Sequence, residues 1–223
     1  MRRRLRTSHL FAVAPLILTA LACGFLFSGE DRQHPAASEP FAPVALAEHD
    51  GSLLVLGAKT PCLARFAPDG GAVDKLPLPA VPSGLAIDGD TAYITAGVSQ
   101  GRVFVVDLKK WKIEKTLAAG HTPVSPVARD GRLWFLDRFA NALVCLDPRQ
   151  AAVIRRHETV REPVALKAAP GGGEPVFWVA NLLPAGRADK GDTAAVVSVF
   201  EAGARTDIPL PNGSHSVRDI AFS

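Results

Sequence analysis

The pattern of apolar and polar positions over Ala92–Leu117 predicts three consecutive β-strands joined by short turns. The runs Tyr93–Thr95 and Val103–Val106 are rich in β-branched and aromatic side chains, which suit a pleated and half-buried surface. Between them, Gly97–Gly101 has the composition of a turn. Lys112–Leu117 alternates apolar and polar residues and forms the third expected strand.

The same unit recurs along the chain from about residue 43. Apolar triplets that precede a turn begin at Val44, Leu85, Val127, Val164 and Ile220, in steps of 41, 42, 37 and 56 residues. The second apolar runs that follow are Leu53–Leu56, Ala92–Thr95, Leu133–Leu136 and Val176–Ala180, and the third runs are Leu63–Phe66, Val103–Val106, Leu143–Leu146 and Val196–Phe200. No segment after residue 43 keeps apolar residues at helical spacing over three turns.

This spacing is typical of the four-stranded blades of a β-propeller, each of about 40 residues. We therefore expect an all-β fold over residues 43–223, with four blades and the first strand of a fifth at Ile220–Phe222. The sequence stops within that fifth unit, and four blades are the smallest usual ring. On this basis we expect an incomplete propeller, the N-terminal part of a longer one.

The second and third runs also carry a family motif. Tyr93-Ile94-Thr95-Ala96 leads to Val103–Asp107, Trp134–Asp137 leads to Leu143–Asp147, and Trp178–Asn181 leads to Val196–Glu201. These pairs resemble the YVTN family of β-propeller repeats, in which a YVTN-like strand precedes a V-x-V-I-D-like strand. The resemblance covers about residues 43–223. It implies the propeller architecture and leaves the function open, because propellers of several kinds share the motif.

One segment resembles a narrower group. Asn181–Val199 is similar to an inserted loop in exported bacterial YVTN proteins, some of which carry a di-haem cytochrome c peroxidase-like domain further along the chain. The resemblance therefore implies haem only in a downstream domain. The sequence itself contains no C-x-x-C-H, so we expect no cofactor in this chain.

The N-terminus has the pattern of an export signal. Four arginines precede the mainly apolar segment Phe11–Ala22, and Ala20-Leu21-Ala22 fits a small-x-small cleavage site. We interpret residues 1–27 as a signal peptide or, since the apolar run extends to about 17 residues, as an uncleaved anchor. Cys23 follows Ala22 and is a candidate for lipidation. Residues 28–42 then read as a flexible linker.

Charge narrows the range of partners. Lys and Arg number 25 against 22 Asp and Glu, but four of the arginines lie at positions 2, 3, 4 and 6. The remainder of the chain is nearly neutral and offers no broad basic face for a phosphate backbone. We therefore expect no nucleic-acid partner, and membrane contact only through the N-terminal segment. The export signal predicts a location in the periplasm or at the cell surface.

A search for catalytic motifs finds no G-x-S-x-G, P-loop, G-x-G-x-x-G or H-E-x-x-H in the sequence, and whether the chain is an enzyme stays open. The six histidines are scattered, so no metal site is predicted. Cys62 and Cys145 fall on third strands of blades one and three, and we interpret them as two buried apolar side chains rather than a disulfide.

Topology predicts one functional face. In an antiparallel blade, the loops between second and third strands emerge at the same end as the blade-to-blade connections. The long segment Asn181–Thr193 lies there, and we select as candidate contact residues Asn181, Arg187, Asp189, His121 and His215. The alternative interpretation is a solvated loop with histidines that cap turns.

Three functions follow from these features. The first is an extracytoplasmic binding or docking module, whose partner is another protein or a downstream domain of the same polypeptide. The second is the propeller portion of a longer c-type cytochrome or di-haem peroxidase-like redox protein. The third, an enzyme that uses a central-channel site, has no residue in the sequence that favours it directly.

Overall fold

The computed structural model describes residues 41–171, 173–185, 194–211 and 216–222. Residues Pro40–Ser223 form one compact unit, and the description that follows concerns that unit alone. It contains strands and turns, and no helix occurs among the described residues. The all-β prediction is therefore confirmed for this part of the chain.

Four sheets account for the strands, and each sheet consists of four consecutive antiparallel strands. Blade 1 contains β1 (Pro43–His49), β2 (Ser52–Gly57), β3 (Cys62–Phe66) and β4 (Ala72–Pro77). Blade 2 contains β5 (Pro82–Asp88), β6 (Thr91–Ala96), β7 (Arg102–Asp107) and β8 (Lys112–Ala118). Blade 3 contains β9 (Pro123–Arg129), β10 (Arg132–Asp137), β11 (Ala142–Asp147) and β12 (Ala152–Glu158). Blade 4 contains β13 (Pro163–Ala168), β14 (Phe177–Asn181), β15 (Val196–Glu201) and β16 (Ala204–Pro209).

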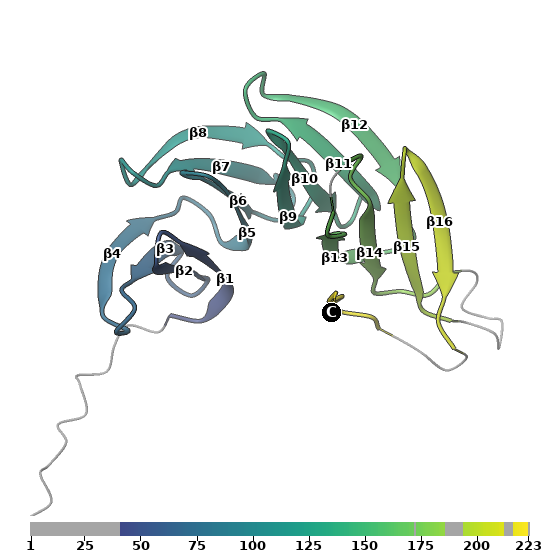
Figure 1. The fold of residues 1–223 in the computed structure, drawn as a ribbon, viewed down its shortest axis with the longest axis horizontal. Coiled ribbons are helices and arrows are strands. Elements are labelled where there is room, and N and C mark those ends of the chain that lie inside the picture. The colour runs from purple at the N-terminus through teal and green to yellow at the C-terminus, as the bar shows by residue number, and fades with distance from the viewer. Residues whose placement is uncertain (1–40, 172, 186–193, 212–215, 223) are drawn as a thin grey trace, which may run out of the picture. The chain divides into compact units, whose positions relative to one another are not determined.

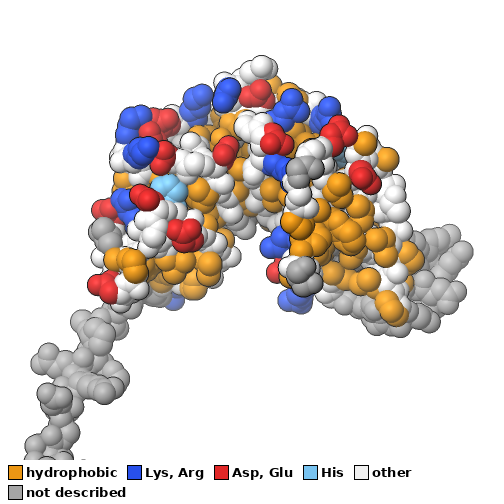
Figure 2. Space-filling view, viewed as in Figure 1, with side chains coloured by type: hydrophobic (Ala, Val, Ile, Leu, Met, Phe, Trp, Pro, Cys, Tyr) orange, Lys and Arg blue, Asp and Glu red, His pale blue; other side chains and the backbone are white. Residues whose placement is uncertain are grey.

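The first strand of each blade lies on the inner side of the array. β1 contacts β5, β5 contacts β9, and β9 contacts β13, whereas β4, β8, β12 and β16 lie on the outer side (Figure 1). This arrangement is that of a β-propeller with four blades. Figure 2 shows Lys, Arg, Asp and Glu side chains gathered along the outer rim.

Blade-to-blade packing explains the unbroken apolar runs of the second and third strands. Alternate residues of a strand point to opposite faces of its sheet, and both faces of an inner blade are covered. In blade 2, Ile94 and Phe104 pack against blade 1, while Tyr93 and Val103 pack against blade 3. Each strand therefore needs apolar residues at every position, as the sequence pattern shows.

The outer strands are different. β16 is exposed at all six positions, and most residues of β8 and β12 are also exposed. Without a buried face they need no apolar run, because the ladder to the third strand holds them in place. This is the reason that the sequence pattern located only one of the four outer strands by residue number.

Hydroxyl groups connect the inner strands of neighbouring blades. Ser83 Oγ in β5 donates to the carbonyl oxygen of Pro123 at 2.5 Å, and Ser125 Oγ in β9 accepts a hydrogen bond from Leu166 N at 2.8 Å. Beside Ser83, Gly84 lies so close to Pro126 that a Cβ at this position would overlap the proline ring. These contacts fix the spacing between blades 2, 3 and 4.

The segment expected to begin a fifth blade forms no strand in the described residues 216–222. It lies against the face of blade 4 that points away from blade 3, where the rings of Trp178 and Phe222 meet edge to face at 5.8 Å and Lys167 Nζ lies 3.6 Å from Asp219 Oδ1.

The two cysteines lie where the repeat pattern placed them. Cys62 in β3 and Cys145 in β11 are both buried, on the third strands of blades 1 and 3. Burial raises the pKa of the Cys145 thiol to about 11, so this side chain is neutral at physiological pH.

Candidate functional site

The turns between second and third strands meet the blade-to-blade connections at one end of the array, which we call the loop face. Gly101 N donates to Gly120 O at 2.9 Å, Thr122 N donates to Val98 O at 2.7 Å, and Thr159 N donates to Asn141 O at 2.9 Å. Each bond joins a second-to-third turn to the connection that leaves the same blade or enters the next one. The predicted topology of this face is confirmed.

Three exposed apolar side chains occupy the same position in successive blades. Val98, Phe139 and Leu183 each lie two residues after the end of the second strand, and 66%, 49% and 37% of their surfaces are exposed. Lys59 holds the equivalent position in blade 1. We call Val98, Phe139 and Leu183 the apolar arc, because consecutive blades carry them at the same turn position on one face.

Contacts between blades connect the first two members of the arc. Thr122 N and Thr122 Oγ1 both donate to the carbonyl oxygen of Val98, at 2.7 and 3.1 Å. The adjacent His121 ring meets the Phe139 ring edge to face, with centroids 5.3 Å apart. The guanidinium carbon of Arg138 lies 5.3 Å from the centre of the same ring. Phe139 is therefore contacted by His121 and Arg138 while half of its surface stays open.

Charged and polar groups continue the connection to blade 4. Arg138 Nη2 lies 2.7 Å from Glu162 Oε2, and Glu162 N donates to Asn141 Oδ1 at 2.8 Å. Leu183 N donates to the carbonyl oxygen of Arg161 at 3.3 Å. The path from Val98 to Leu183 is thus continuous across blades 2, 3 and 4, which makes the loop face a preorganised surface.

A buried carboxylate fixes the centre of this surface. Asp137, 1% exposed at the end of β10, accepts hydrogen bonds from His121 N at 3.0 Å and from Arg156 Nη2 at 3.0 Å. Gly120 has a φ of 73° and lies against the Asp137 carboxylate, with no space for a Cβ. The sequence Gly120-His121 therefore positions the histidine ring beside Phe139.

The structure places the candidate contact residues unequally. His121 is exposed on the loop face, as expected. Arg187, Asp189 and His215, together with the lipidation candidate Cys23, lie outside the described residues.

Asn181 requires a correction, because its side chain is fully buried at the end of β14 rather than displayed on the loop. Its Nδ2 donates to Val196 O and Ser198 Oγ, each at 3.1 Å, and Ser198 Oγ donates in turn to Asp207 Oδ1 at 2.7 Å. Asn181 thus joins three strands of blade 4. An asparagine beside a long insertion suggested a contact residue, but its strand position turns it inward.

Neither the apolar arc nor the Arg138–Glu162 pair was predicted from the sequence. A signal was present, since Val98, Phe139 and Leu183 follow the YVTN-like strand at a constant spacing. The spacing indicates a contact surface only when the turn is known to face solvent, because apolar residues are more often buried.

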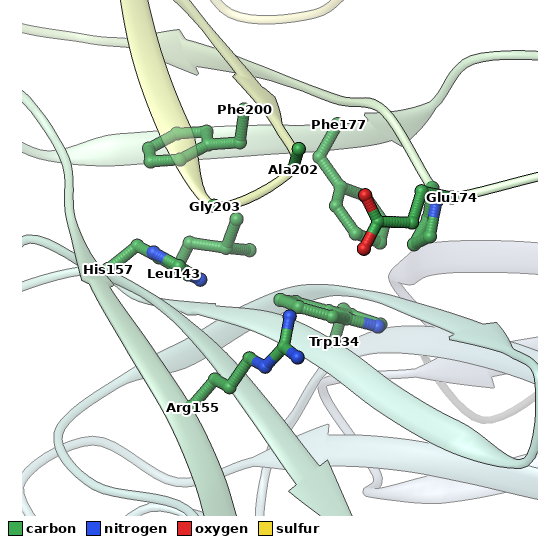
Figure 3. A pocket seen from close by; sticks show the side chains of 10 residues that line it. Trp134, Leu143, Arg155, His157, Glu174, Phe177, Phe200, Ala202 and Gly203 are labelled. Atoms are coloured by element: carbon green, nitrogen blue, oxygen red, sulfur yellow. The ribbon is translucent and has the colours of Figure 1, made fainter.

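Two of the cavities among the described residues bear on the packing of the blades. One, of about 490 Å³, is lined by the inner strands of all four blades, with Ser83, Ser125, Arg138 and Lys167 among its polar residues. The other lies between blades 3 and 4, where Trp134, His157, Phe177 and Phe200 surround a space of about 30 Å³ (Figure 3). The second space is water-sized, and its aromatic walls account for packing between the two blades.

The described residues show neither a metal site nor a membrane-spanning helix. No group of three or more His, Cys, Asp or Glu side chains among them could hold a metal ion. They also include no helix with the length and apolar character needed to cross a membrane.

No protein-family model matches the chain, and no curated protein matches its sequence. Solved structures do match. Hydrazine synthase of Kuenenia stuttgartiensis is 14% identical with a TM-score of 0.64, over 81% of this chain and 53% of that one. A streptogramin B lyase is 13% identical with a TM-score of 0.67, over 84% and 61%. The Pan2 WD40 domain of Neurospora crassa is 11% identical with a TM-score of 0.60, over 78% and 54%.

The chain has a β-propeller fold. Identities of this size show the fold alone, and the chain spans between 53% and 61% of the length of these three structures. Membership of the YVTN family stays a prediction.

Proposed function

We propose that this chain is an extracytoplasmic β-propeller of the YVTN type that serves as a binding or docking module for a protein partner. The observation that carries the proposal is the apolar arc of Val98, Phe139 and Leu183. Exposed apolar side chains cost free energy in water, and a repeated array of them at one loop position is typical of a contact surface.

The rigidity of the arc supports the same conclusion. The hydrogen bonds of Thr122 to Val98, and the ring contacts of His121 and Arg138 with Phe139, hold the arc in one arrangement before any partner arrives. A surface held in its bound arrangement loses less conformational entropy on association. Apolar anchors of this kind supply much of the binding energy at protein interfaces.

The proposed location rests on the N-terminal sequence. The arginine cluster and the apolar segment Phe11–Ala22 are those of an export signal, which would place the propeller in the periplasm or at the cell surface. A fusion of alkaline phosphatase after residue 43 tests this, because the phosphatase is active only outside the cytoplasm of a bacterial host. An inactive fusion found in the cytosol would contradict it.

The binding proposal is tested by replacing the arc. The triple variant Val98→Ser, Phe139→Ser, Leu183→Ser should keep its fold and lose the partner that the native chain captures from extracytoplasmic fractions of the source cells. A matched control replaces two exposed apolar residues of the outer strand β12, Val153→Ser and Ile154→Ser, which are 52% and 39% exposed. Equal capture by all three chains would refute the proposal. No described residue favours the redox alternative, which stays a prediction from the family resemblance.

A further inference from the structure

The charge of the loop face identifies the kind of partner that fits the apolar arc, an inference that rests on the proposed function. The described turns of this face carry three cations, Lys59, Arg138 and Arg161, and one carboxylate, Glu162. Glu162 is already paired with Arg138 at 2.7 Å. Within the described residues, Lys59 and Arg161 form no ion pair with a carboxylate. Arg161 Nη2 donates a hydrogen bond to the carbonyl oxygen of Pro184 at 3.3 Å, and this neutral partner leaves the charge of Arg161 uncompensated.

The opposite end of the array has the reverse character. Its turns contain the carboxylates Asp50, Asp69, Asp90, Asp130 and Glu174 against the cations Lys109, Lys110 and Arg149. Several of these charges are paired at the surface: the hydrogen bond from Lys109, at 2.5 Å, lowers the pKa of Asp90.

The two ends of the array also differ in the number of exposed apolar side chains in their turns. None of the large exposed apolar side chains among the described residues lies in the turns of the acidic end, whereas the loop face carries Val81, Val98, Phe139 and Leu183. Exposed apolar side chains and a net positive charge in the described turns therefore occur together at the loop face only.

We propose that the loop face binds an acidic protein segment that carries apolar side chains. The apolar groups of the segment cover Val98, Phe139 and Leu183, and its carboxylates pair with Arg161 and Lys59 at the two ends of the arc. Arg161 is suited to this role because its guanidinium can bind a carboxylate through two parallel hydrogen bonds. Complementary charge also selects the partner and accelerates its association.

A nucleic acid fits this surface less well. Only two cations of the described loop face are available for phosphates, whereas phosphate-binding surfaces neutralise many charges along a backbone. The arc presents aliphatic side chains at two of its three positions, which provide no stacking platform for bases. An acidic protein segment uses both the charges and the apolar groups that the face presents.

The probe for the test is a displayed library of random 12-residue peptides, selected on the native chain and in parallel on the Val98→Ser, Phe139→Ser, Leu183→Ser variant. The peptide most enriched on the native chain alone is then synthesised, and its affinity is measured by fluorescence anisotropy. We expect it to contain several Asp or Glu residues among Leu, Ile, Phe or Trp. We also expect its affinity to fall at least about fivefold between 50 and 500 mM salt, since exposed charges are screened.

A charge variant separates this inference from the proposed function. Lys59→Glu with Arg161→Glu should weaken binding of the acidic peptide by about tenfold or more. The control pair Lys112→Glu with Arg149→Glu, which leaves the loop face intact, should change it by less than about twofold. Circular dichroism and the Tm of each variant check that the blades remain folded.

The outcomes are distinct. The proposal of an acidic partner would be wrong if the arc-dependent peptides were neutral or basic, or if they bound equally well to the Lys59→Glu, Arg161→Glu variant. The docking function would stand in either case. Enrichment that is the same on the native chain and on the arc variant would overturn both proposals. Preferential binding of single-stranded DNA, tested as a competitor of the peptide at equal salt, would replace the protein partner with a nucleic acid.

Discussion

Two phenylalanines of blade 3 provide the most direct test of the distinction between core and contact surface. Phe135 in β10 is 1% exposed and packs between blades 2 and 3, whereas Phe139, four residues later, is 49% exposed on the loop face. The same substitution, Phe→Ala, can therefore be compared at two positions of one blade.

The expected free energies differ. Truncation of a buried phenylalanine costs about 3–5 kcal/mol, because the transfer free energy is lost and a cavity remains. At Phe139 about half of the side chain is buried, and the contacts with His121 and Arg138 that cover it are each worth about 0.5–1 kcal/mol, so the total is about 1–2 kcal/mol. For a domain of this size, about 1 kcal/mol shifts the Tm by about 2–4 °C. Phe135→Ala should thus lower the Tm by about 10 °C, and Phe139→Ala by about 4 °C.

Urea denaturation and thermal circular dichroism measure both values on the same preparations. Partner capture should respond in the opposite order, with Phe139→Ala losing the partner and folded Phe135→Ala retaining it. A loss of stability at Phe139 as large as that at Phe135 would show that Phe139 is a packing residue. In that case the apolar arc would not be a free surface, and the docking proposal would lose its main support.

Three further predictions follow from single contacts. Gly84→Ala should lower the free energy of unfolding by about 1–3 kcal/mol, because the new Cβ overlaps Pro126; an unchanged urea midpoint would contradict this packing. Asn181→Ala should cost about 1–3 kcal/mol in the same assay through loss of its buried hydrogen bonds, whereas a change confined to partner binding would restore it as a contact residue. Native Cys145 should resist thiol reagents at pH 8, because burial raises the pKa of its thiol to about 11; rapid labelling of the native chain would show that the thiol is exposed. The free energy of unfolding should also fall as the pH rises above about 9, because the thiol then ionises in the unfolded chain but not in the folded one.

Much of the fold could be predicted from the sequence. The second and third strands of all four blades appear as apolar runs, and in blades 2 and 3 both faces of these strands are buried. There β6, β7, β10 and β11 agree with the predicted runs to within one residue at each end. Outer strands such as β16 could not be located in this way, since they have no buried face to impose a pattern.

The site was predicted only in part. Antiparallel topology alone placed the turns after the second strands and the blade-to-blade connections at one end, and His121 was correctly assigned to it. Asn181 was assigned to the surface because polar residues near a long insertion usually face solvent, yet the amide is buried and bonded to Ser198. Residue type does not reveal the direction of a side chain at the end of a strand.

By itself, the sequence determined the repeat, the number of described blades and the end at which their long loops emerge. Each of these depends on local alternation of apolar residues and on chain direction, which neighbouring residues specify. Only the tertiary structure decided that Val98, Phe139 and Leu183 form one surface and that Asn181 belongs to the core. Exposure depends on whether another blade covers a side chain, and the covering residues lie about 40 positions away in the chain.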